Sequence, residues 1–393
     1  MKKLQLAIFT LSFISAPLYG ADFFCSDVTC LIAAINEANL SEGPHTIFLE
    51  QGVYTLTDFD PDGNLLPSIR REIAIQSYPP NTVTIERPRG DSALHRLFDV
   101  SVSGALSVFW LTLQPHEGFG ISTHIALNNG RLVFYGTAIL GGVNDSPGQI
   151  VNNGSILFYQ STIDAVSSFH AGVIYNTGDA EIIGSTVSRG TGNGPIIWNR
   201  PAAQLLIRDS SIIHNASSTA TISNLGNLTI INTTLANNAG IVGHGDAALE
   251  NFGGVVSILN STIAQNRGLG GGILNSSGGT VMLKNSIVAL NAPLDCLGEI
   301  TSQGSNIIGD PTGCTIELLP DDLTGYAGLG EFSDNGDPGN GHFPLLSDSP
   351  AIDSADPDAC PETDQLGNPR VGICDRGSIE FQGGEGEMLV QNP

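Results

Sequence analysis

Lysine is nearly absent from this sequence, in which Lys2, Lys3 and Lys284 are the only lysines among 393 residues. Charged residues of all kinds make up 14% of the chain, and 39 acidic side chains against 15 Lys and Arg give a formal net charge of −24. A surface of this sign repels phosphate backbones and anionic lipid headgroups, which argues against nucleic acid or an acidic lipid surface as the partner. Divalent cations and cationic partners remain compatible with it, and so does the simple solubility of an acidic protein.

Long apolar runs are also missing after the first twenty residues. Those twenty residues combine a basic start at Lys2 and Lys3, the apolar stretch LQLAIFTLSFISA, and small residues at Gly20 and Ala21. This pattern predicts a signal peptide over residues 1–20, and hence a protein that is secreted or held at the cell surface or outer membrane. A membrane anchor is the alternative, but the stretch is shorter than the roughly 20 residues that a span needs. We therefore expect no transmembrane segment after signal removal.

Cysteine is scarce, at six residues, and all six lie outside the middle of the chain. They form three pairs that are close in sequence: Cys25 with Cys30, Cys296 with Cys314, and Cys360 with Cys374. Six cysteines allow fifteen connectivities, and proximity favours pairing between neighbours in an exported protein. A metal site is the alternative, although no C-x-x-C pair is present.

Glycine is abundant, at 48 residues, and a short apolar pattern recurs through the middle of the chain. It reads VFWLTL, VFYGTA, FYQSTI, IIGSTV, IRDSSI, IINTTL, ILNSTI and LKNSIV, at spacings of 23 to 28 residues. The last residues form one apolar column: Leu113, Ala138, Ile163, Val187, Ile212, Leu235, Ile263 and Val288. Five positions earlier lies a second: Val108, Val133, Phe158, Ile182, Ile207, Ile230, Ile258 and Leu283. The residue before the first column is Ser or Thr in seven of eight segments, which indicates a bend.

This repeat predicts an all-β fold, a right-handed parallel β-helix of about 25 residues per coil. Helical repeats do not fit, because the segments alternate with period two and carry glycine. A further column of Asn follows the short apolar strands half a coil away and is expected to form a structural ladder of side-chain amides. Its members are Asn128, Asn152, Asn176, Asn199, Asn224, Asn251 and Asn275. We expect a short helical cap over 21–42, the β-helix over 43–310, a small C-terminal capping domain over 311–383 and a tail over 384–393.

The N-terminal region reads FCSDVTCLIAAINEAN followed by HTIFLEQGVYTLT. It resembles the CSLREA-type region of bacterial exported proteins, in which a Cys precedes a helix and then a pair of strands. The likeness covers roughly residues 24–115. The family's Arg-Glu pair is missing here, because the matching stretch is Leu31-Ile-Ala-Ala-Ile35.

The C-terminal region reads GSNIIGDPTGC, FPLLSDSPAIDSA, TDQLGNPR and CDRGSIEF. It resembles the choice-of-anchor Q domain, which caps parallel β-helices of secreted and surface-attached bacterial proteins. The family's polar positions fall on Asp353, Asp364, Arg370, Asp375 and Glu380, and we expect a buried network that holds the cap. GGGILNSSG at 270–278 is more weakly similar to repeats of polymorphic outer-membrane adhesins.

Candidate catalytic residues are few. Gly243-His244-Gly245-Asp246 is similar to the GHG signature of polygalacturonases, which makes His244 and Asp246 candidates, although a turn histidine is the simpler interpretation. A lyase needs an Arg or Lys base near acidic groups, and a hydrolase needs paired carboxylates. Arg208 and Asp209 stand on one coil, but Lys284 lies three coils further along the same column, about 14 Å away at the usual strand spacing. The column also holds Phe109, Phe134 and Tyr159, a stripe that could stack on sugar rings if it faces outward, or otherwise pack under a loop.

Asp58, Asp60 and Asp62, followed by Gly63, copy the first half of a calcium loop. The twelfth position is Ile69 instead of the bidentate Glu, so a polar turn is an equally good interpretation. Calcium is thus the one cofactor that the sequence suggests, and none is required.

Taken together, the sequence favours an exported, non-enzymatic β-helix protein that binds glycan or protein at a cell envelope or host surface, as an adhesin does. The alternative is a polysaccharide lyase or glycoside hydrolase acting on a polyuronate or another polysaccharide. A cleft lined by carboxylates and Arg or His in neighbouring coils would favour the enzyme.

Overall fold

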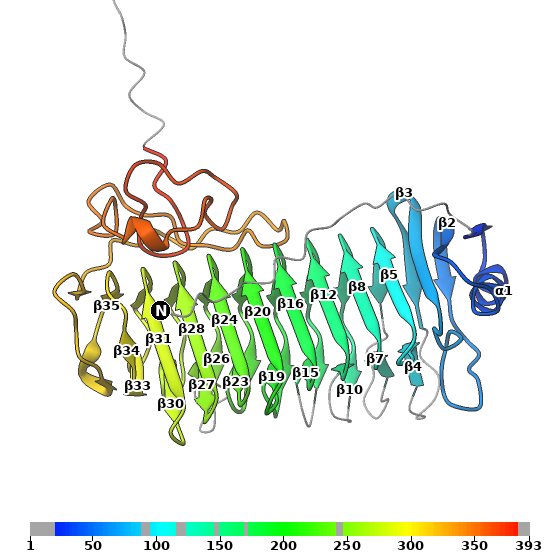
Figure 1. Ribbon diagram of the computed structural model, residues 1–393, viewed down its shortest axis with the longest axis horizontal. Helices are drawn as coiled ribbons and strands as arrows, with labels where there is room; N and C mark the ends of the chain where they lie inside the picture. The colour runs from blue at the N-terminus through cyan, green and yellow to red at the C-terminus, as the bar shows by residue number, and fades with distance from the viewer. Residues whose placement is uncertain are drawn as a thin grey trace, which may run out of the picture.

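The computed structural model describes residues 20–87, 95–114, 123–144, 149–168, 172–240 and 247–383. These residues form an elongated right-handed parallel β-helix whose coils stack along one axis (Figure 1). The predicted fold class is therefore confirmed. The predicted signal peptide, apart from Gly20, and the tail after residue 383 lie outside the described residues.

Three sheets run along the stack in the described part of the chain, and one α-helix follows their first strand. The 22-stranded sheet contains β1 (Asp22–Cys25), β2 (His45–Thr55), β3 (Glu72–Glu86), β5 (Ala105–Phe109), β6 (Thr112–Gln114), β8 (Arg131–Tyr135), β9 (Ala138–Leu140), β12 (Ser155–Tyr159), β13 (Thr162–Asp164), β16 (Asp179–Ile183), β17 (Thr186–Ser188), β20 (Gln204–Arg208), β21 (Ser211–Ile213), β24 (Asn227–Ile231), β25 (Thr234–Ala236), β28 (Val255–Leu259), β29 (Thr262–Ala264), β31 (Thr280–Lys284), β32 (Ile287–Ala289), β34 (Thr301–Ser302), β35 (Ile307–Ile308) and β37 (Leu323–Thr324). The ten-stranded sheet contains β4 (His95–Val100), β7 (Thr123–Asn128), β11 (Ile150–Asn152), β15 (Ile174–Asn176), β19 (Ile197–Asn199), β23 (Ile222–Asn224), β27 (Ala247–Phe252), β30 (Gly271–Ser276), β33 (Cys296–Glu299) and β36 (Cys314–Thr315). The five-stranded sheet contains β10 (Val143–Asn144), β14 (Ser167–Ser168), β18 (Thr191–Gly192), β22 (Ala216–Ser217) and β26 (Ala239–Gly240). The helices are α1 (Val28–Ala38) and the 3₁₀ turns η1 (Pro311–Gly313) and η2 (Pro357–Ala359).

The interior is filled by the predicted apolar columns, with one exception. Ile163 pairs in register with Val187, and the same register continues through Ile212, Leu235, Ile263 and Val288. All of these side chains are buried. Each rung therefore stacks on a like rung one strand spacing away, which is how a solenoid excludes water without a spherical core.

The exception is the coil that contains β8 and β9, where our register was wrong by one residue. Ile139 and Phe134 occupy the two interior columns, in place of Ala138 and Val133. Because side chains alternate along a strand, a slip of one residue turns every side chain to the other face. Val133 and Phe134 are both apolar, so the pattern allowed either choice; Phe134 faces inward and stacks on Phe158 with ring centroids 5.3 Å apart.

The Asn column forms the expected ladder in the ten-stranded sheet. From Asn128 to Asn275, each Nδ2 donates to the Oδ1 of the Asn on the next coil, over 2.7 to 3.0 Å. A second ladder was not predicted and joins Asn215, Asn238, Asn266 and Asn291, with N···O distances of 2.9 to 3.0 Å. Its signal was present, because an Asn stands three residues after the interior column in each of these coils.

The N-terminal end is closed by α1, as expected. Asp27 caps the helix by accepting a hydrogen bond from the Cys30 backbone N–H at 2.8 Å, and Leu31 and Ile35 bury one face against the first coil. The cap differs from the prediction in one respect: β1 precedes the helix and already pairs in parallel with β2. The solenoid therefore begins at Asp22 instead of residue 43, with the helix inserted after its first strand.

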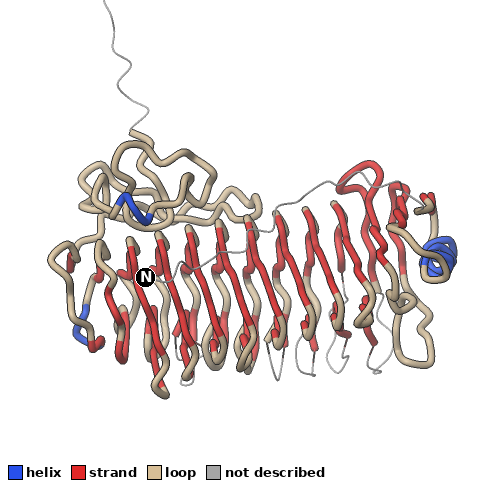
Figure 2. The backbone as a smooth tube through the Cα atoms, viewed as in Figure 1, coloured by secondary structure: helices blue, strands red, loops and turns tan. Residues whose placement is uncertain are grey.

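The C-terminal segment, residues 325–383, lies along the flank of the solenoid instead of over its end (Figures 1 and 2). Phe343 packs in one buried cluster with Ile213, Ala236 and Ala264. Leu345 and Ala351 pack in a second with Ile287, Ala289 and Ile307. The contacted residues of the solenoid lie on β21, β25, β29, β32 and β35 and have apolar or small side chains. The C-terminal segment buries them.

All three predicted disulfides are present: Cys25–Cys30, Cys296–Cys314 and Cys360–Cys374. The first joins β1 to the cap helix, the second joins the last coils of the ten-stranded sheet, and the third closes a loop within the C-terminal segment. Among the described residues, no helix combines the length and the hydropathy that a membrane span would need.

Candidate functional site

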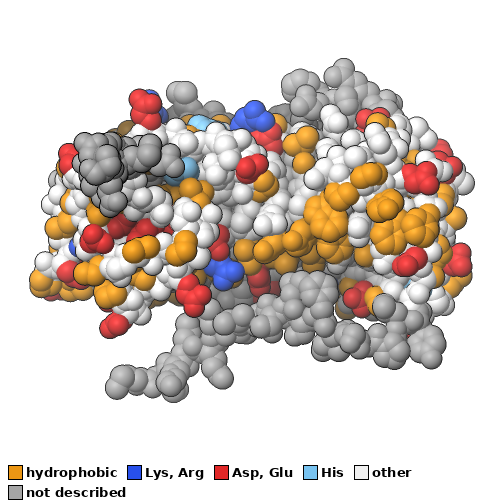
Figure 3. All heavy atoms as spheres, turned by 90° about the horizontal axis from the view of Figure 1, so that it is seen from above, with side chains coloured by type: hydrophobic (Ala, Val, Ile, Leu, Met, Phe, Trp, Pro, Cys, Tyr) orange, Lys and Arg blue, Asp and Glu red, His pale blue; other side chains and the backbone are white. Residues whose placement is uncertain are grey.

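An aromatic row runs along the outside of the 22-stranded sheet in its N-terminal half. Phe109, Tyr135 and Tyr159 are paired in register on β5, β8 and β12, and they alternate with the buried interior column. The ring centroids of Phe109 and Tyr135 are 5.8 Å apart, and those of Tyr135 and Tyr159 are 5.0 Å apart and nearly parallel. Tyr135 thus takes the place in the stripe that the sequence assigned to Phe134. In Figure 3 a band of apolar side chains covers this face and runs toward the C-terminal segment.

Trp110 extends the row at the bend that follows β5. Its backbone is in the left-handed region, at φ 53°, which is uncommon and strained for a bulky residue. The residues that follow Tyr135, Tyr159, Ile183 and Arg208 on the next coils share this conformation and are all smaller or polar: Gly136, Gln160, Gly184 and Asp209.

The Trp110 indole lies against Gly136 of the next coil. A Cβ added at Gly136 would stand 2.5 Å from Cδ1 and 3.0 Å from Nε1 of the indole, so only glycine leaves room for the ring. The same ring meets Tyr135 edge-on, with centroids 5.7 Å apart. Trp110 is thus held by its neighbours as part of the aromatic row. These contacts offset the cost of its strained backbone.

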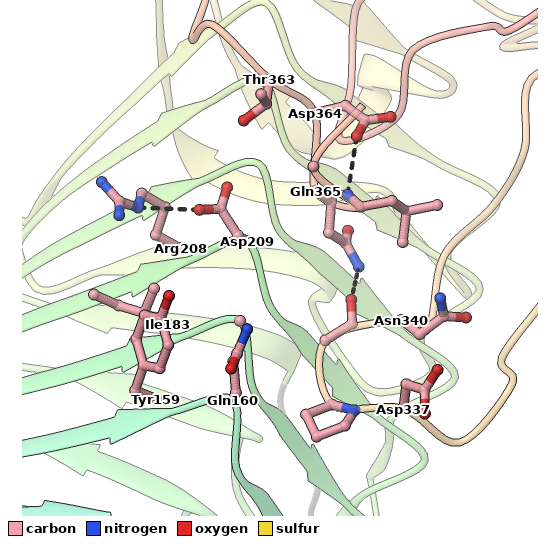
Figure 4. Close-up of a pocket in the computed structure, with 15 residues that line it drawn as sticks. Tyr159, Gln160, Ile183, Arg208, Asp209, Asp337, Asn340, Thr363, Asp364 and Gln365 are labelled. Atoms are coloured by element: carbon pink, nitrogen blue, oxygen red, sulfur yellow. Dashed lines mark hydrogen bonds and ion pairs between the residues drawn. The ribbon is translucent and has the colours of Figure 1, made fainter. Parts of the chain in front are cut away.

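A cleft of about 410 Å³ lies where the aromatic row meets the C-terminal segment (Figure 4). The solenoid contributes the end of β12, the bend at Gln160, and Ile183, Arg208 and Asp209. Residues 337–340 and 363–367 of the C-terminal segment form the facing wall. Tyr159 belongs both to the aromatic row and to the cleft, so the two are continuous.

Arg208 and Asp209 supply the charge of the cleft on the solenoid side. The Arg208 Nε lies 3.1 Å from Asp209 Oδ2, and Asn232 Nδ2 donates to Asp209 Oδ1 at 3.1 Å. Burial raises the pKa of Asp209, and the bonds from Asn232 and Arg208 oppose that rise. The Arg208 side chain remains 44% exposed, so its guanidinium retains donors that face solvent.

The carboxylates on the facing wall differ in what they can bind. Asp364 is fully buried, and its two oxygens accept from the backbone N–H groups of Leu366, Asn368 and Glu380 and from the Asn368 side chain. It shapes the loop and has no remaining capacity for a ligand. Asp337 is exposed and accepts one bond, from Asn335 Nδ2 at 2.9 Å. Asp209 and Asp337 are therefore the carboxylates of the cleft that a ligand can reach.

Beyond Asp209 the bend column is covered. Asn232 donates to the Thr363 carbonyl at 2.7 Å and accepts from Arg370 at 3.0 Å, and Asn260 donates to the Asp375 carbonyl at 3.2 Å. Both Asn side chains are buried. The Ser/Thr column, which lies on the strands that follow the bend, is covered as well. Ser211 on β21 donates to the Gly341 carbonyl, and Thr234 on β25 donates to the Gln365 side chain. The sequence placed this column at a bend and did not reveal that it faces outward to receive the segment.

Of the five residues of the predicted polar network, Asp364, Arg370, Asp375 and Glu380 have buried side chains and are bonded to one another or to the segment's backbone, whereas Asp353 is exposed and takes part through its backbone N–H. Arg370 and Glu380, both nearly inaccessible, form an ion pair with N···O 3.1 Å, and Arg370 also donates to the Asp375 and Gly377 carbonyls. Asp375 accepts from the backbone N–H groups of Asp353 and Phe381. Burial raises the pKa of the Asp375 carboxyl to about 6, and these two hydrogen bonds partly oppose the rise.

The other predicted sites fare differently. His244 and Asp246 lie outside the described residues. Asp60 organises its own turn, because Oδ1 accepts from the N–H groups of Asp62 and Asn64 and Oδ2 accepts from the Asn64 side chain. Among the described residues no group of three or more His, Cys, Asp or Glu side chains is placed to hold a metal ion, and calcium binding by Asp58, Asp60 and Asp62 stays a prediction. Lys284 shares the Arg208 column but pairs with Asp356 at 2.7 Å.

Comparison with known proteins bears on the fold. No protein-family description matches this sequence, and no curated protein matches it. Among solved structures, pectate lyase Pel9A superposes with a TM-score of 0.54 at 12% identity, over 92% of this chain and 96% of that one. The A-modules of mannuronan C-5 epimerases AlgE4 and AlgE6 from Azotobacter vinelandii have TM-scores of 0.40 at 12% and 14% identity, over 77% of this chain and 94% and 95% of theirs. At 12% identity the likeness to Pel9A concerns the parallel β-helix fold alone and leaves the chemistry of the site open.

Proposed function

We propose that this protein binds a neutral polysaccharide along the aromatic row and into the cleft, without cleaving it, as an exported adhesin-like protein of the cell envelope. The observation that carries the proposal is the row itself, which consists of Phe109, Trp110, Tyr135 and Tyr159 and leads into a polar cleft. A sugar ring has an apolar face of C–H groups and a rim of hydroxyls. It therefore needs aromatic platforms beside planar polar side chains, and the row and the cleft supply both.

Charge favours a neutral ligand over a polyuronate. The chain carries a net charge of −24, and the reachable side chains of the cleft include Asp209 and Asp337 beside Arg208. A polyanion would meet repulsion from the whole molecule and from these carboxylates. Pectate lyase Pel9A is named for such an anionic substrate. In our proposal the two proteins therefore share a fold and bind different ligands.

The test is binding to a panel of soluble neutral polysaccharides, measured by affinity electrophoresis and calorimetry. Tyr135→Ala should weaken binding about fivefold, because loss of one stacked ring removes roughly 1 kcal/mol. Tyr175→Ala is the matched control, since Tyr175 is a partly exposed Tyr on β15 of the ten-stranded sheet, next to Trp198. Equal affinities of the two variants, or no binding to any member of the panel, would refute the proposal.

Fluorescence can locate the ligand directly, because Trp110 and Trp198 are the only tryptophans in the chain. In a Trp198→Phe variant, the emission of Trp110 should change on addition of a bound polysaccharide. Gly136→Ala should weaken binding although every aromatic ring is retained, since its Cβ would displace the indole. An unchanged Trp110 signal during saturable binding would place the ligand elsewhere.

The cleft supports a second candidate, a polysaccharide lyase or hydrolase. Asp209 is a carboxylate of raised pKa beside Arg208, and such a pair suits proton abstraction better than an exposed Asp does. Assays for reducing ends and for unsaturated products, with and without Ca²⁺, separate the two candidates. Turnover that is lost in Asp209→Asn would establish the enzyme and end the purely adhesive proposal.

Export and envelope location belong to the same proposal and rest on residues 1–20 and on the resemblances at both ends of the chain. Cell fractionation of the full-length chain against a chain lacking residues 2–20 tests them. Retention of the full-length protein in the cytoplasm would contradict export.

A further inference from the structure

We infer, on the basis of the proposed function, that the ligand is a branched neutral polysaccharide whose main chain lies along the aromatic row and whose side branch enters the cleft. The outward column that carries the row does not stop at the cleft. It continues in register from coil to coil with side chains that stay at least partly exposed: Tyr159, Ile183, Arg208, Ile231 and Leu259. A main chain that follows this column therefore passes the cleft.

The cleft lies to one side of that column. On the solenoid it is lined by the bend residues that come directly after the column: Gln160, Gly184 and Asp209. Gly339 of the C-terminal segment lies against two of these bends, since a Cβ added there would stand 2.8 Å from the Asp209 carbonyl oxygen and 2.9 Å from the Gly184 carbonyl carbon. The Gly339 N–H donates to Thr186 Oγ1 at 2.8 Å, which fixes the wall to the solenoid. A group that enters the cleft from the row must project sideways from the main chain, as a branch does.

Both sides of the cleft carry polar groups that a branch sugar can use. Figure 4 shows Gln160 and Asp209 on the solenoid side and Asp337 and Asn340 on the facing side. The Gln160 side chain is exposed and makes no hydrogen bond to the described residues, so its amide can donate to one hydroxyl and accept from another. The cleft volume of about 410 Å³ lies within the range of roughly 300–1,000 Å³ that is typical of small-molecule sites, which leaves room for a short branch.

The charges of the cleft restrict the kind of branch. Asp209 and Asp337 would repel a branch that carries a carboxylate, so a neutral sugar is favoured. A linear chain on the row would leave the polar groups of the cleft in contact with water alone. The cleft would then add nothing to the affinity of that chain.

The decisive measurement compares matched polysaccharides with and without branches. Soluble fragments of galactomannan, xyloglucan and arabinoxylan are each titrated by calorimetry, as prepared and after enzymatic removal of the branches. At least one branched form should bind about tenfold or more tightly than its debranched partner. Equal affinities within every pair, with binding still weakened by Tyr135→Ala, would overturn the inference and leave the proposed function standing. No binding of any form would refute both.

A variant of the cleft completes the test. Gln160→Ala should weaken binding of the branched form about fivefold, the equivalent of one hydrogen bond, and should leave binding of the debranched form unchanged. Binding of the debranched form thus also verifies that the variant is folded. Gln204→Ala is the matched control, since Gln204 is an exposed Gln at the start of β20, away from the cleft. A preference for the branched form that survives Gln160→Ala and Asp337→Ala undiminished would place the branch elsewhere and contradict the inference.

Discussion

The Asn ladder offers a quantitative test of what holds the solenoid together, because it places a buried and an exposed Asn side by side. Asn152 is fully buried; its Nδ2 donates to Asn176 Oδ1 at 2.7 Å and to the Asp179 carbonyl at 2.9 Å, and its Oδ1 accepts from Asn128 at 2.7 Å. Asn153 is exposed, and its side chain donates to Asn129 at 2.9 Å and accepts from Thr177 at 2.7 Å. The two residues share chemistry and position and differ in burial.

Asn152→Ala should cost far more than Asn153→Ala. Truncation at position 152 leaves an N–H of Asn128 and the carbonyl of Asp179 without these partners inside the protein, and each buried group left unsatisfied costs about 1–3 kcal/mol. We therefore expect a loss of about 3 kcal/mol in the free energy of unfolding for Asn152→Ala. For Asn153→Ala water replaces the lost partners, and we expect about 0.5 kcal/mol or less.

The assay is equilibrium unfolding in guanidinium chloride, followed by far-UV circular dichroism, with the m values compared to verify that the same transition is observed. The double variant Asn152→Ala, Asn176→Ala should cost less than the sum of its parts, because the two residues share a hydrogen bond. If the two single variants differ by less than about 0.5 kcal/mol, the buried hydrogen bonds of the ladder do not stabilise the fold.

Three further predictions concern the C-terminal segment and the acidic turn. Because burial raises the pKa of Asp375 to about 6, its contribution to stability is complete below about pH 4 and declines as the pH rises through 6; Asp375→Asn should remove this decline in melting curves recorded between pH 4 and 7, and an unchanged slope would contradict it. Replacing Cys360 and Cys374 by Ser should cost about 3 kcal/mol locally and expose residues 325–383 to limited proteolysis while the solenoid persists, unlike replacement of Cys25 and Cys30; identical digestion patterns would argue against a role in holding the segment. Asp60→Ala should lower the melting temperature equally in Ca²⁺ and in EDTA, since it removes three hydrogen bonds of the turn. A decrease seen only with Ca²⁺ would indicate that this turn binds calcium.

Sequence reasoning succeeded where a local pattern repeats in every coil. Ile163, Val187 and Ile212 could be aligned because period-two alternation and a constant coil length assign them to one interior column. The Asn ladder and the disulfides followed from the same kind of evidence, namely recurrence and proximity in sequence. The same reasoning failed between Val133 and Ile139, because two adjacent apolar residues satisfy either register.

The candidate site was only partly visible from the sequence. The aromatic stripe was noted, but its outward orientation and the correct member Tyr135 required the register of β8. The strained Trp110 backbone and its dependence on Gly136 join residues of different coils, and no periodic signal marks them. Arg208 and Asp209 were identified as neighbours on one coil, whereas the wall that faces them comes from more than a hundred residues later in the chain.

The sequence by itself thus determined the stacking of coils, since each rung repeats the same short-range information and buries itself against its neighbour. Only the tertiary structure decided where the C-terminal segment lies, because that depends on single contacts such as Ser211 with Gly341, 130 residues apart, which occur once and leave no period. The path of the segment supplies one wall of the cleft beside Tyr159. The repeating surface therefore acquires a cleft only where a segment that does not repeat lies against it.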